Sequence, residues 1–238
     1  MASISEVGHS KNVANFSTLF QILEEMGIIY NPTNSNIQLA NLVSVKASLA
    51  TVIQTLNEKK PLYKNAVANR ETAIAPLGKT ASNVLNAFKS LNVTTADKDN
   101  ISSIVKKIRG DKKIAKPNPE TTATEGISTS QMSYDSRIAN FDVLINTLNT
   151  HPEYNPNEEN LKTSTLQNFQ QNLGTLSSEV NATGNALITA RLNRNTILYS
   201  NPDNVIQLVK EIKAYLKSLG EAGQPYYKAA VKLKFTDI

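Results

Sequence analysis

The sequence has no cysteine, no tryptophan and only two histidines in 238 residues. Without cysteine there is no disulfide framework and no thiolate nucleophile, which fits a reducing compartment. Glu6 and His9 form the one Glu-x-x-His spacing, whereas a di-iron bundle needs that motif on two core helices, and His151 stands alone. Motifs of zinc proteases, serine hydrolases, P-loops and dinucleotide folds are missing too. We therefore expect a protein that is not an enzyme, with no catalytic residues, no metal ligands and no cofactor.

Long apolar runs are also missing, because no uninterrupted run approaches the roughly 18 residues expected of a membrane span. The first residues, MASISEVGHSK, lack the apolar centre of a signal peptide. We expect no transmembrane segment and a cytoplasmic protein, with export by a non-classical route left open. The net charge of +5 is placed unevenly, since residues 1–110 hold 12 basic and 7 acidic side chains.

Two glycine-poor stretches, residues 31–75 and 155–199, carry apolar side chains in alternating steps of three and four. This heptad seam is typical of long helices that pack at a shallow angle. Each stretch predicts one helix of about 40 residues that needs packing along its seam to be stable. Pro61 interrupts only the first stretch and predicts a kink there. The seam positions are Leu42, Val45, Leu49, Val52, Leu56, Lys59, Tyr63, Ala66, Arg70 and Ala73, then Leu166, Phe169, Leu173, Leu176, Val180, Thr183, Leu187, Ala190, Arg194 and Ile197.

Short sequence words recur in the same order about 124 residues apart. VANF (13–16) returns as IANF (138–141), YNP (30–32) as YNP (154–156), and NRET (69–72) as NRNT (193–196). The sequence therefore predicts an all-α fold built by tandem duplication of a four-helix unit, each with one long helix. In the first unit, shorter helices are expected at about 80–91 and 100–109, the latter capped by Asp99 or Asn100. The predicted boundaries are a flexible N-terminus (1–10), a first unit (11–109), a linker (110–128) and a second unit (129–238).

The words KNVANF (11–16), YNP (30–32) and NRE (69–71) resemble a group of uncharacterised helical proteins of Bacteroidota bacteria. Members of that group have a short helix, a YNP-like turn and a long helix with an Asn-Arg-Glu-like word near its end. The resemblance covers nearly the whole chain and implies the fold and a bacterial source, but no activity. The second copy departs from the pattern, because Asn195 stands where Glu71 stands in the first.

Arg70 and Arg194 occupy seam positions where an apolar side chain is expected. A buried guanidinium must be paired, because an unpaired buried charge is very costly. With the neighbouring Asn69 and Asn193, the two arginines form a candidate site for an anion or a protein partner. The alternative is structural: a polar cluster that fixes the helix register, or an arginine that reaches solvent at the helix end.

A Tyr-Asn-Pro turn precedes each long stretch and is a second candidate feature. Asparagine as N-cap with proline in the first helical position predicts that the helix begins there, with Ser35 a competing start in the first copy. The tyrosine predicts a staple that packs on the first turn, and ligand stacking is the alternative. The residues are Tyr30, Asn31 and Pro32, and Tyr154, Asn155 and Pro156.

These features favour a non-catalytic helical scaffold that acts by association with a protein partner or with itself. The alternative is a nucleic-acid-associated protein, because basic side chains gather near residues 106–116 and could contact phosphates. That cluster also fits a solvated helix end, and aromatic residues suited to base stacking are not interleaved with it. Its members are Lys106, Lys107, Arg109, Lys112, Lys113 and Lys116.

Overall fold

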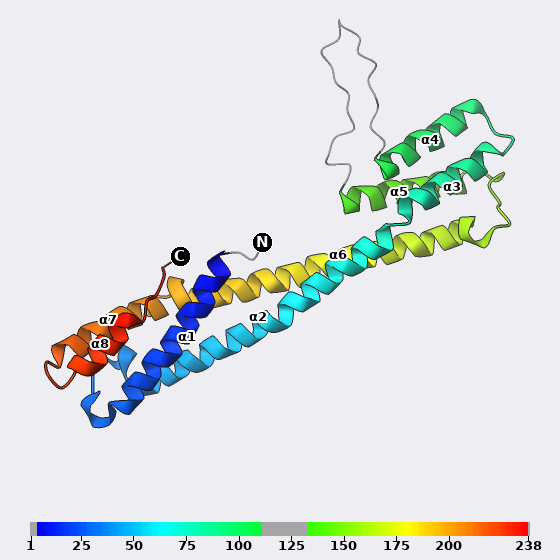
Figure 1. The fold of residues 1–238 in the computed structure, drawn as a ribbon. Coiled ribbons are helices and arrows are strands. Elements are labelled where there is room, and N and C mark those ends of the chain that lie inside the picture. The colour runs from blue at the N-terminus through cyan, green and yellow to red at the C-terminus, as the bar shows by residue number, and fades with distance from the viewer. Residues whose placement is uncertain (1–3, 111–132, 238) are drawn as a thin grey trace, which may run out of the picture. The chain divides into compact units, whose positions relative to one another are not determined.

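The structure is a computed structural model that describes residues 4–110 and 133–237, and these form helices and turns without any strand. The predicted all-α class is confirmed, and most of the predicted linker lies outside the described residues (Figure 1). The first half of the chain holds α1 (Ile4–Glu25), η1 (Gly27–Ile29), η2 (Ser35–Ile37), α2 (Leu39–Ile74), α3 (Leu77–Lys89) and α4 (Thr95–Arg109). The second half holds α5 (Tyr134–Asn149), η4 (Glu159–Leu161), α6 (Thr163–Asn195), η5 (Thr196–Ser200), α7 (Val205–Ser218) and α8 (Gln224–Lys232).

The chain divides into two compact units that cut across the predicted ones. The terminal unit combines residues 1–61 with 185–238, and the middle unit comprises residues 62–184. The predicted boundaries of 11–109 and 129–238 therefore do not enclose the compact bodies, because α2 and α6 each contribute to both. A seam as long as that of α2, a helix of 36 residues, extends beyond one small core, so its two ends enter different cores.

The terminal unit is built around aliphatic and aromatic side chains of α1 and α7. Phe16, Leu19 and Leu23 lie one helical turn apart on α1 and are almost completely buried. On α7, Val205, Leu208 and Ile212 form a second buried stripe, and side chains of α2, η5 and α8 complete the core. The remaining members of this core include Met26, Tyr30, Ile37, Leu42, Leu49, Leu198, Val209, Leu216 and Ala230.

The middle unit packs α3, α4 and α5 against parts of the long helices. Phe88 of α3 and Phe141 of α5 are completely buried at its centre. Thr94 caps α4 by accepting a hydrogen bond from the backbone N–H of Asp97, so the predicted cap at Asp99 or Asn100 is wrong. The other buried members are Ile74, Leu77, Ala81, Val84, Leu85, Ile101, Ile104, Val105, Ile108, Ile138, Leu144, Ile145, Leu148, Tyr154, Leu166 and Leu173.

The heptad seams are confirmed, since none of the predicted seam positions is exposed. Leu42, Leu49 and Leu56 of α2 are buried, and so are Leu173 and Leu187 of α6. In the middle unit α2 and α6 approach each other closely at Gly184, because a Cβ atom there would lie 3.3 Å from Cε2 of Tyr63. Glycine on that face of α6 therefore makes room for the tyrosine ring.

Several predicted helix ends are wrong. The first ten residues are not a flexible tail as far as they are described, because α1 begins at Ile4 and His9 is only 4% exposed. The long helices begin at Leu39 and Thr163, not at the asparagine and proline of the preceding turns. The last turn of the second predicted helix is a separate π-helix, η5. Tertiary contacts described below account for the first two differences.

One described stretch, Leu39–Lys89, is long and apolar enough to cross a membrane when judged by length and composition alone. Its most apolar window has a mean hydropathy of 1.3, and only 17% of that window is buried. The expectation that the chain has no transmembrane segment stays a prediction. The leucines at the seam positions 42, 49 and 56, however, pack inside the protein.

The seam predicts that truncating a buried side chain of the middle unit destabilises the protein far more than truncating an exposed one. We expect Leu173→Ala to lower the free energy of unfolding by about 2–5 kcal/mol, because it empties a fully buried site. Val143→Ala on α5, where the valine is 49% exposed, should change it by less than about 0.5 kcal/mol. Urea denaturation followed by circular dichroism measures both values, and equal effects would contradict the seam assignment.

Candidate functional site

The turn between α1 and α2 is fixed by contacts at both of its ends. Met26 and Tyr30 are buried, and the backbone N–H of Tyr30 donates to the carbonyl of Gly27. Gly27 has φ +52°, a left-handed conformation that glycine adopts without strain. The hydroxyl of Tyr30 donates to the carbonyl oxygen of Ile37 at 2.6 Å and closes the loop before α2. This bond explains why the helix begins at Leu39, because residues 30–38 form a closed loop instead of a first helical turn.

Tyr215 of α7 supports the same turn from the side. Its ring meets the ring of Tyr30 edge-to-face with centroids 5.4 Å apart, and its hydroxyl accepts a hydrogen bond from the backbone N–H of Asn31. Burial, with a smaller effect of Tyr215, raises the pKa of Tyr30 far above its ordinary value. Tyr30 is therefore held by η2 and α7, and Pro32 beside it is buried. The packing of its ring on the first turn of the long helix stays a prediction.

Ile28 is the most exposed large apolar side chain described in the protein, with 98% of its surface in solvent. Ile29 beside it is 41% exposed, and both lie between the buried Met26 and Tyr30. The turn thus presents an apolar projection, here called the isoleucine knob (Ile28 and Ile29), on a rigid base. Glu24 and Glu25 precede it and are exposed, and neither forms an ion pair among the described residues.

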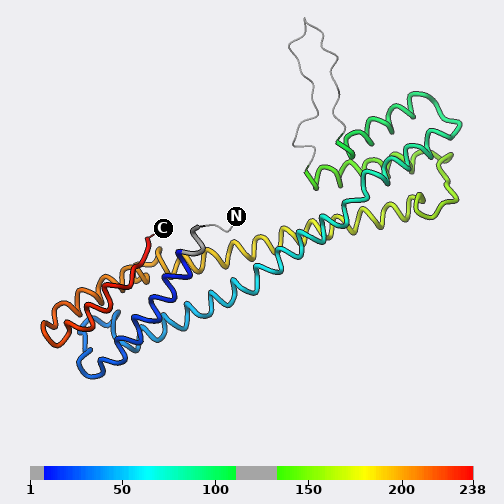
Figure 2. Tube along the Cα trace, in the orientation of Figure 1, coloured from blue at the N-terminus to red at the C-terminus, as the bar shows by residue number. Residues whose placement is uncertain are grey.

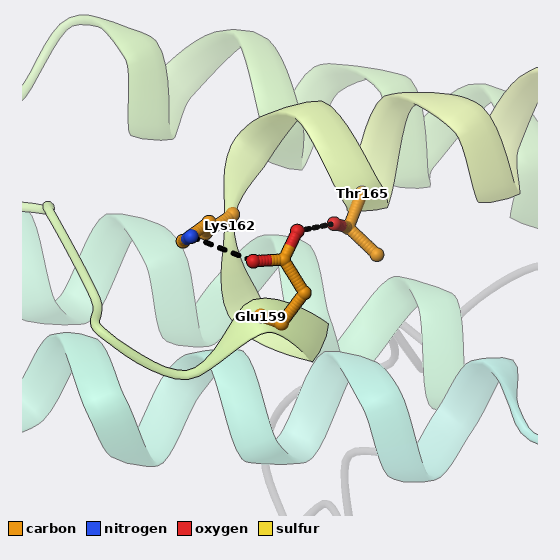
Figure 3. Close-up of polar contacts among 3 residues, drawn as sticks. All are labelled: Glu159, Lys162 and Thr165. Atoms are coloured by element: carbon orange, nitrogen blue, oxygen red, sulfur yellow. Dashed lines mark hydrogen bonds and ion pairs between the residues drawn. The ribbon is translucent and has the colours of Figure 1, made fainter.

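The corresponding turn of the middle unit keeps the tyrosine but not the knob. Tyr154 is buried, and its hydroxyl donates to the carbonyl oxygen of Leu161 at 2.9 Å. Pro152 and Glu153 take the places of the two isoleucines in the sequence repeat. At the start of α6, Figure 3 shows Glu159 between Lys162, at 2.6 Å, and the hydroxyl of Thr165, at 3.3 Å. The hydrogen bond and charge of Lys162, assisted by Thr165, lower the pKa of Glu159.

Arg194 belongs to a buried polar cluster in the terminal unit. It is 6% exposed and donates from Nε and Nη2 to the amide oxygen of Asn195 at 3.1 and 2.9 Å. A side-chain amide is therefore among the hydrogen-bond partners of this buried guanidinium. Burial raises the pKa of the nearby Tyr199, and the hydrogen bond of Asn12 and the charge of Arg194 oppose that rise.

His9 and Asn12 join this cluster from α1. His9 Nδ1 lies 2.7 Å from the Tyr199 hydroxyl, to which Asn12 Nδ2 donates at 3.1 Å. Asn12 also exchanges two hydrogen bonds with the backbone of Thr236, at 2.8 and 3.0 Å. The C-terminal segment therefore runs along α1 (Figure 2). These contacts explain why α1 extends through the residues expected to be flexible.

Arg70 lies in a different setting in the middle unit. Its guanidinium carbon is 4.1 Å from the centroid of the Tyr134 ring, a cation–π contact. Its Nε atom is buried and has no hydrogen-bond partner in the described part of the chain. The two seam arginines thus use unlike partners, whereas Asn69 and Asn193 are both exposed and lie outside these contacts.

The predicted basic stretch is only half described. Lys106, Lys107 and Arg109 are exposed in the last turn of α4, where cations interact favourably with the helix dipole. The lysines at 112, 113 and 116 lie outside the described residues. Among residues 4–110 and 133–237, no three His, Asp or Glu side chains gather as a metal site would require.

Two hollows differ in the charge of their walls. In the terminal unit, a cavity of about 360 Å³ lies between α7, α8 and the segment after α8, with apolar walls and three lysines. In the middle unit, a groove of about 380 Å³ between α5 and α6 is lined by Asp135, Asp142 and uncharged polar groups. Ser177 in that groove donates a hydrogen bond to Asp135. Sequence reasoning found neither hollow, because each joins residues that are distant in the chain.

Burial of tyrosine hydroxyls makes the free energy of unfolding depend on pH in the alkaline range. Burial, assisted by the charge of Glu158, raises the pKa of Tyr154 to about 12 from 10.0. Because the folded pKa exceeds the unfolded one, the contribution is complete below about pH 10 and is lost as the pH rises toward about 12. Between about pH 9 and pH 11, the free energy of unfolding should therefore fall less for Tyr154→Phe than for the wild type. Urea denaturation at the two pH values measures both changes. Tyr227→Phe, at a partly exposed site, should keep the full loss, and equal losses in all three would contradict the assignment.

Comparisons with known proteins give no indication of the function. The resemblance to helical proteins of Bacteroidota stays a prediction, as does the absence of enzymatic activity. No protein-family model, no curated protein and no solved structure matches the chain.

Proposed function

We propose that the protein is a non-catalytic helical scaffold that acts by associating with other protein surfaces, its own included. The observation that carries this proposal is the isoleucine knob, with Ile28 98% exposed on a turn whose two ends are buried. A large apolar side chain in water contributes nothing to the folded monomer, and its burial against a partner is worth roughly 1.5–3 kcal/mol.

The rigidity of the turn supports the same role. Association must offset the entropy lost when an anchor is ordered, and a preformed anchor reduces that cost. Tyr30, held by Ile37 and Tyr215, fixes the base of the knob before any partner arrives. An aliphatic side chain can serve as the central anchor of an interface when it fills a pocket on the partner.

Charge favours a protein partner over a membrane surface. The stretch from Glu24 to Asn36 holds two carboxylates and no lysine or arginine. Cytoplasmic membrane leaflets are anionic and attract basic segments, so this acidic turn is poorly suited to them. Insertion of the apolar stretch within Leu39–Lys89 would also remove Leu42 and Leu49 from the core of the terminal unit.

We further infer that the two halves of the chain descend from one duplicated unit. The order of short helix, 3-10 turn, long helix and two short helices occurs twice. Tyr30 and Tyr154 each bond a carbonyl seven residues further along the chain. Arg137 on α5 donates at 2.9 Å to the carbonyl of Ile108, near the end of α4. Asn15 on α1 donates to the carbonyl of Lys234, just after α8. The first helix of each half therefore bonds the backbone at the end of the last helix of a half.

The nucleic-acid alternative has less support. The basic side chains described near the end of α4 are those that a helix C-terminus ordinarily carries. Near the three described cations the sequence offers no aromatic platform for bases, which single-stranded nucleic-acid binders use.

A photo-crosslinking experiment tests the proposed role. A benzophenone amino acid placed at Ile28 in the full chain should form covalent adducts with protein in native cells. The same probe at Ala222, an exposed position of the turn between α7 and α8, should form few. Mass spectrometry of the adducts identifies the partner, whether a second copy or another protein. If position 28 gives no more adducts than position 222, the knob is not an association site and the proposal fails.

A further inference from the structure

We propose that the isoleucine knob of one copy docks into the lysine-lined cavity of the terminal unit of a second copy, joining chains head to tail. This contact rests on the proposed role in association and adds its partner and its two surfaces. The cavity, here called the lysine pocket, measures about 360 Å³, within the range of pockets that take side chains or small ligands.

The floor of the lysine pocket is apolar. Ile206 and Val209 on α7 are 7% and 3% exposed and form its base. Val231, at the end of α8, is 48% exposed and leaves an apolar wall open to solvent. Leu233 and Phe235 complete the lining. Such a surface gains stability when branched aliphatic side chains displace water from it.

The rim of the lysine pocket is cationic. Lys210 and Lys234 are exposed, and Lys213 donates from Nζ to the carbonyl oxygen of Leu233 at 2.9 Å. None of the three forms an ion pair with a carboxylate in the described part of the chain. Burial lowers the pKa of Lys213, because desolvation disfavours its charged form. A carboxylate from a partner would offset this desolvation cost.

The pocket wall is held in place before any partner binds. Asn15 Nδ2 donates to the carbonyl of Lys234 at 2.6 Å, and Asn12 pairs with the backbone of Thr236. The segment after α8 is therefore anchored from α1 on one side and from Lys213 on the other. A fixed wall keeps the cavity open and lowers the ordering cost of docking.

Knob and pocket match in both polarity and charge. The knob offers Ile28 and Ile29 beside Glu24 and Glu25, and the pocket offers an apolar floor beside three lysines. The groove of the middle unit does not match, because Asp135 and Asp142 would repel the same glutamates. Since knob and pocket are different surfaces of one chain, the contact is heterologous and can continue from copy to copy.

The affinity should be modest and should depend on salt. Two isoleucines and a few charges cover less area than a standard stable interface, which buries about 1,600 Å² in total. We therefore expect association in the range of about 10 µM to 1 mM, weakening as the ionic strength rises.

Sedimentation velocity of the purified full chain over that concentration range tests the contact. The wild type should grow from monomer to dimer and larger species. A knob variant (Ile28→Ser with Ile29→Ser) and a pocket variant (Lys210→Glu with Lys234→Glu) should each lose at least about tenfold in association constant. Mixing the two variants should restore a dimer that grows no further, because only one intact knob and one intact pocket remain.

Matched controls separate this contact from general stickiness. Ile188→Ser with Leu192→Ser removes another exposed apolar pair, and Lys64→Glu with Lys79→Glu makes the same charge change in the middle unit. Both controls should associate like the wild type. Glu24→Lys with Glu25→Lys, added to the pocket variant, should restore association, because the charges of knob and pocket are then exchanged. Failure of both this rescue and the mixing test would overturn the proposal.

The remaining outcomes are equally decisive. A wild type that stays monomeric throughout, or whose pocket is filled by a co-purifying acyl chain in native mass spectrometry, would overturn the self-contact. In that case adducts to another protein at position 28 would still uphold the proposed function. Absence of both self-association and cellular adducts would remove the two proposals together.

Discussion

Both cores depend on the burial of two narrow seams along the long helices. An isolated helix of ordinary composition is marginal in water, so α2 and α6 are stable only where their seams are covered. The first part of α2 gives Leu42 and Leu49 to the terminal unit, and its last residue, Ile74, lies in the core of the middle unit. A seam of this length is too long to be covered by one small core. Each compact unit therefore takes elements from both halves of the sequence.

The periodic parts of this fold are predictable from the sequence, because the heptad rule acts between neighbouring turns. The seam positions of α6, including the polar Thr183 and Arg194, are buried or partly buried as the spacing requires. The start of α2 is not predictable in the same way. Asparagine and proline before a periodic stretch are good start signals, but the bond from Tyr30 to the Ile37 carbonyl holds those residues in a loop.

Long-range contacts explain the other differences. His9 and Tyr199 are 190 residues apart, and nothing near His9 in the sequence signals that it is buried. The division into units has the same cause, since it depends on which halves of α2 and α6 share a core. The knob, by contrast, had a local signal: two isoleucines after a glycine, outside any helical period.

The two Tyr-Asn-Pro turns allow one part of the chain to be compared with another. The tyrosine, its hydrogen bond and its buried ring occur in both, because each closes the loop before a long helix. The outward-facing positions differ: Ile28 and Ile29 in one turn, Pro152 and Glu153 in the other. The fold therefore requires the tyrosine but does not require the isoleucines. An apolar pair that stabilises no core and favours unwanted contacts needs a reason outside the folded monomer, and a complementary surface on a partner supplies one.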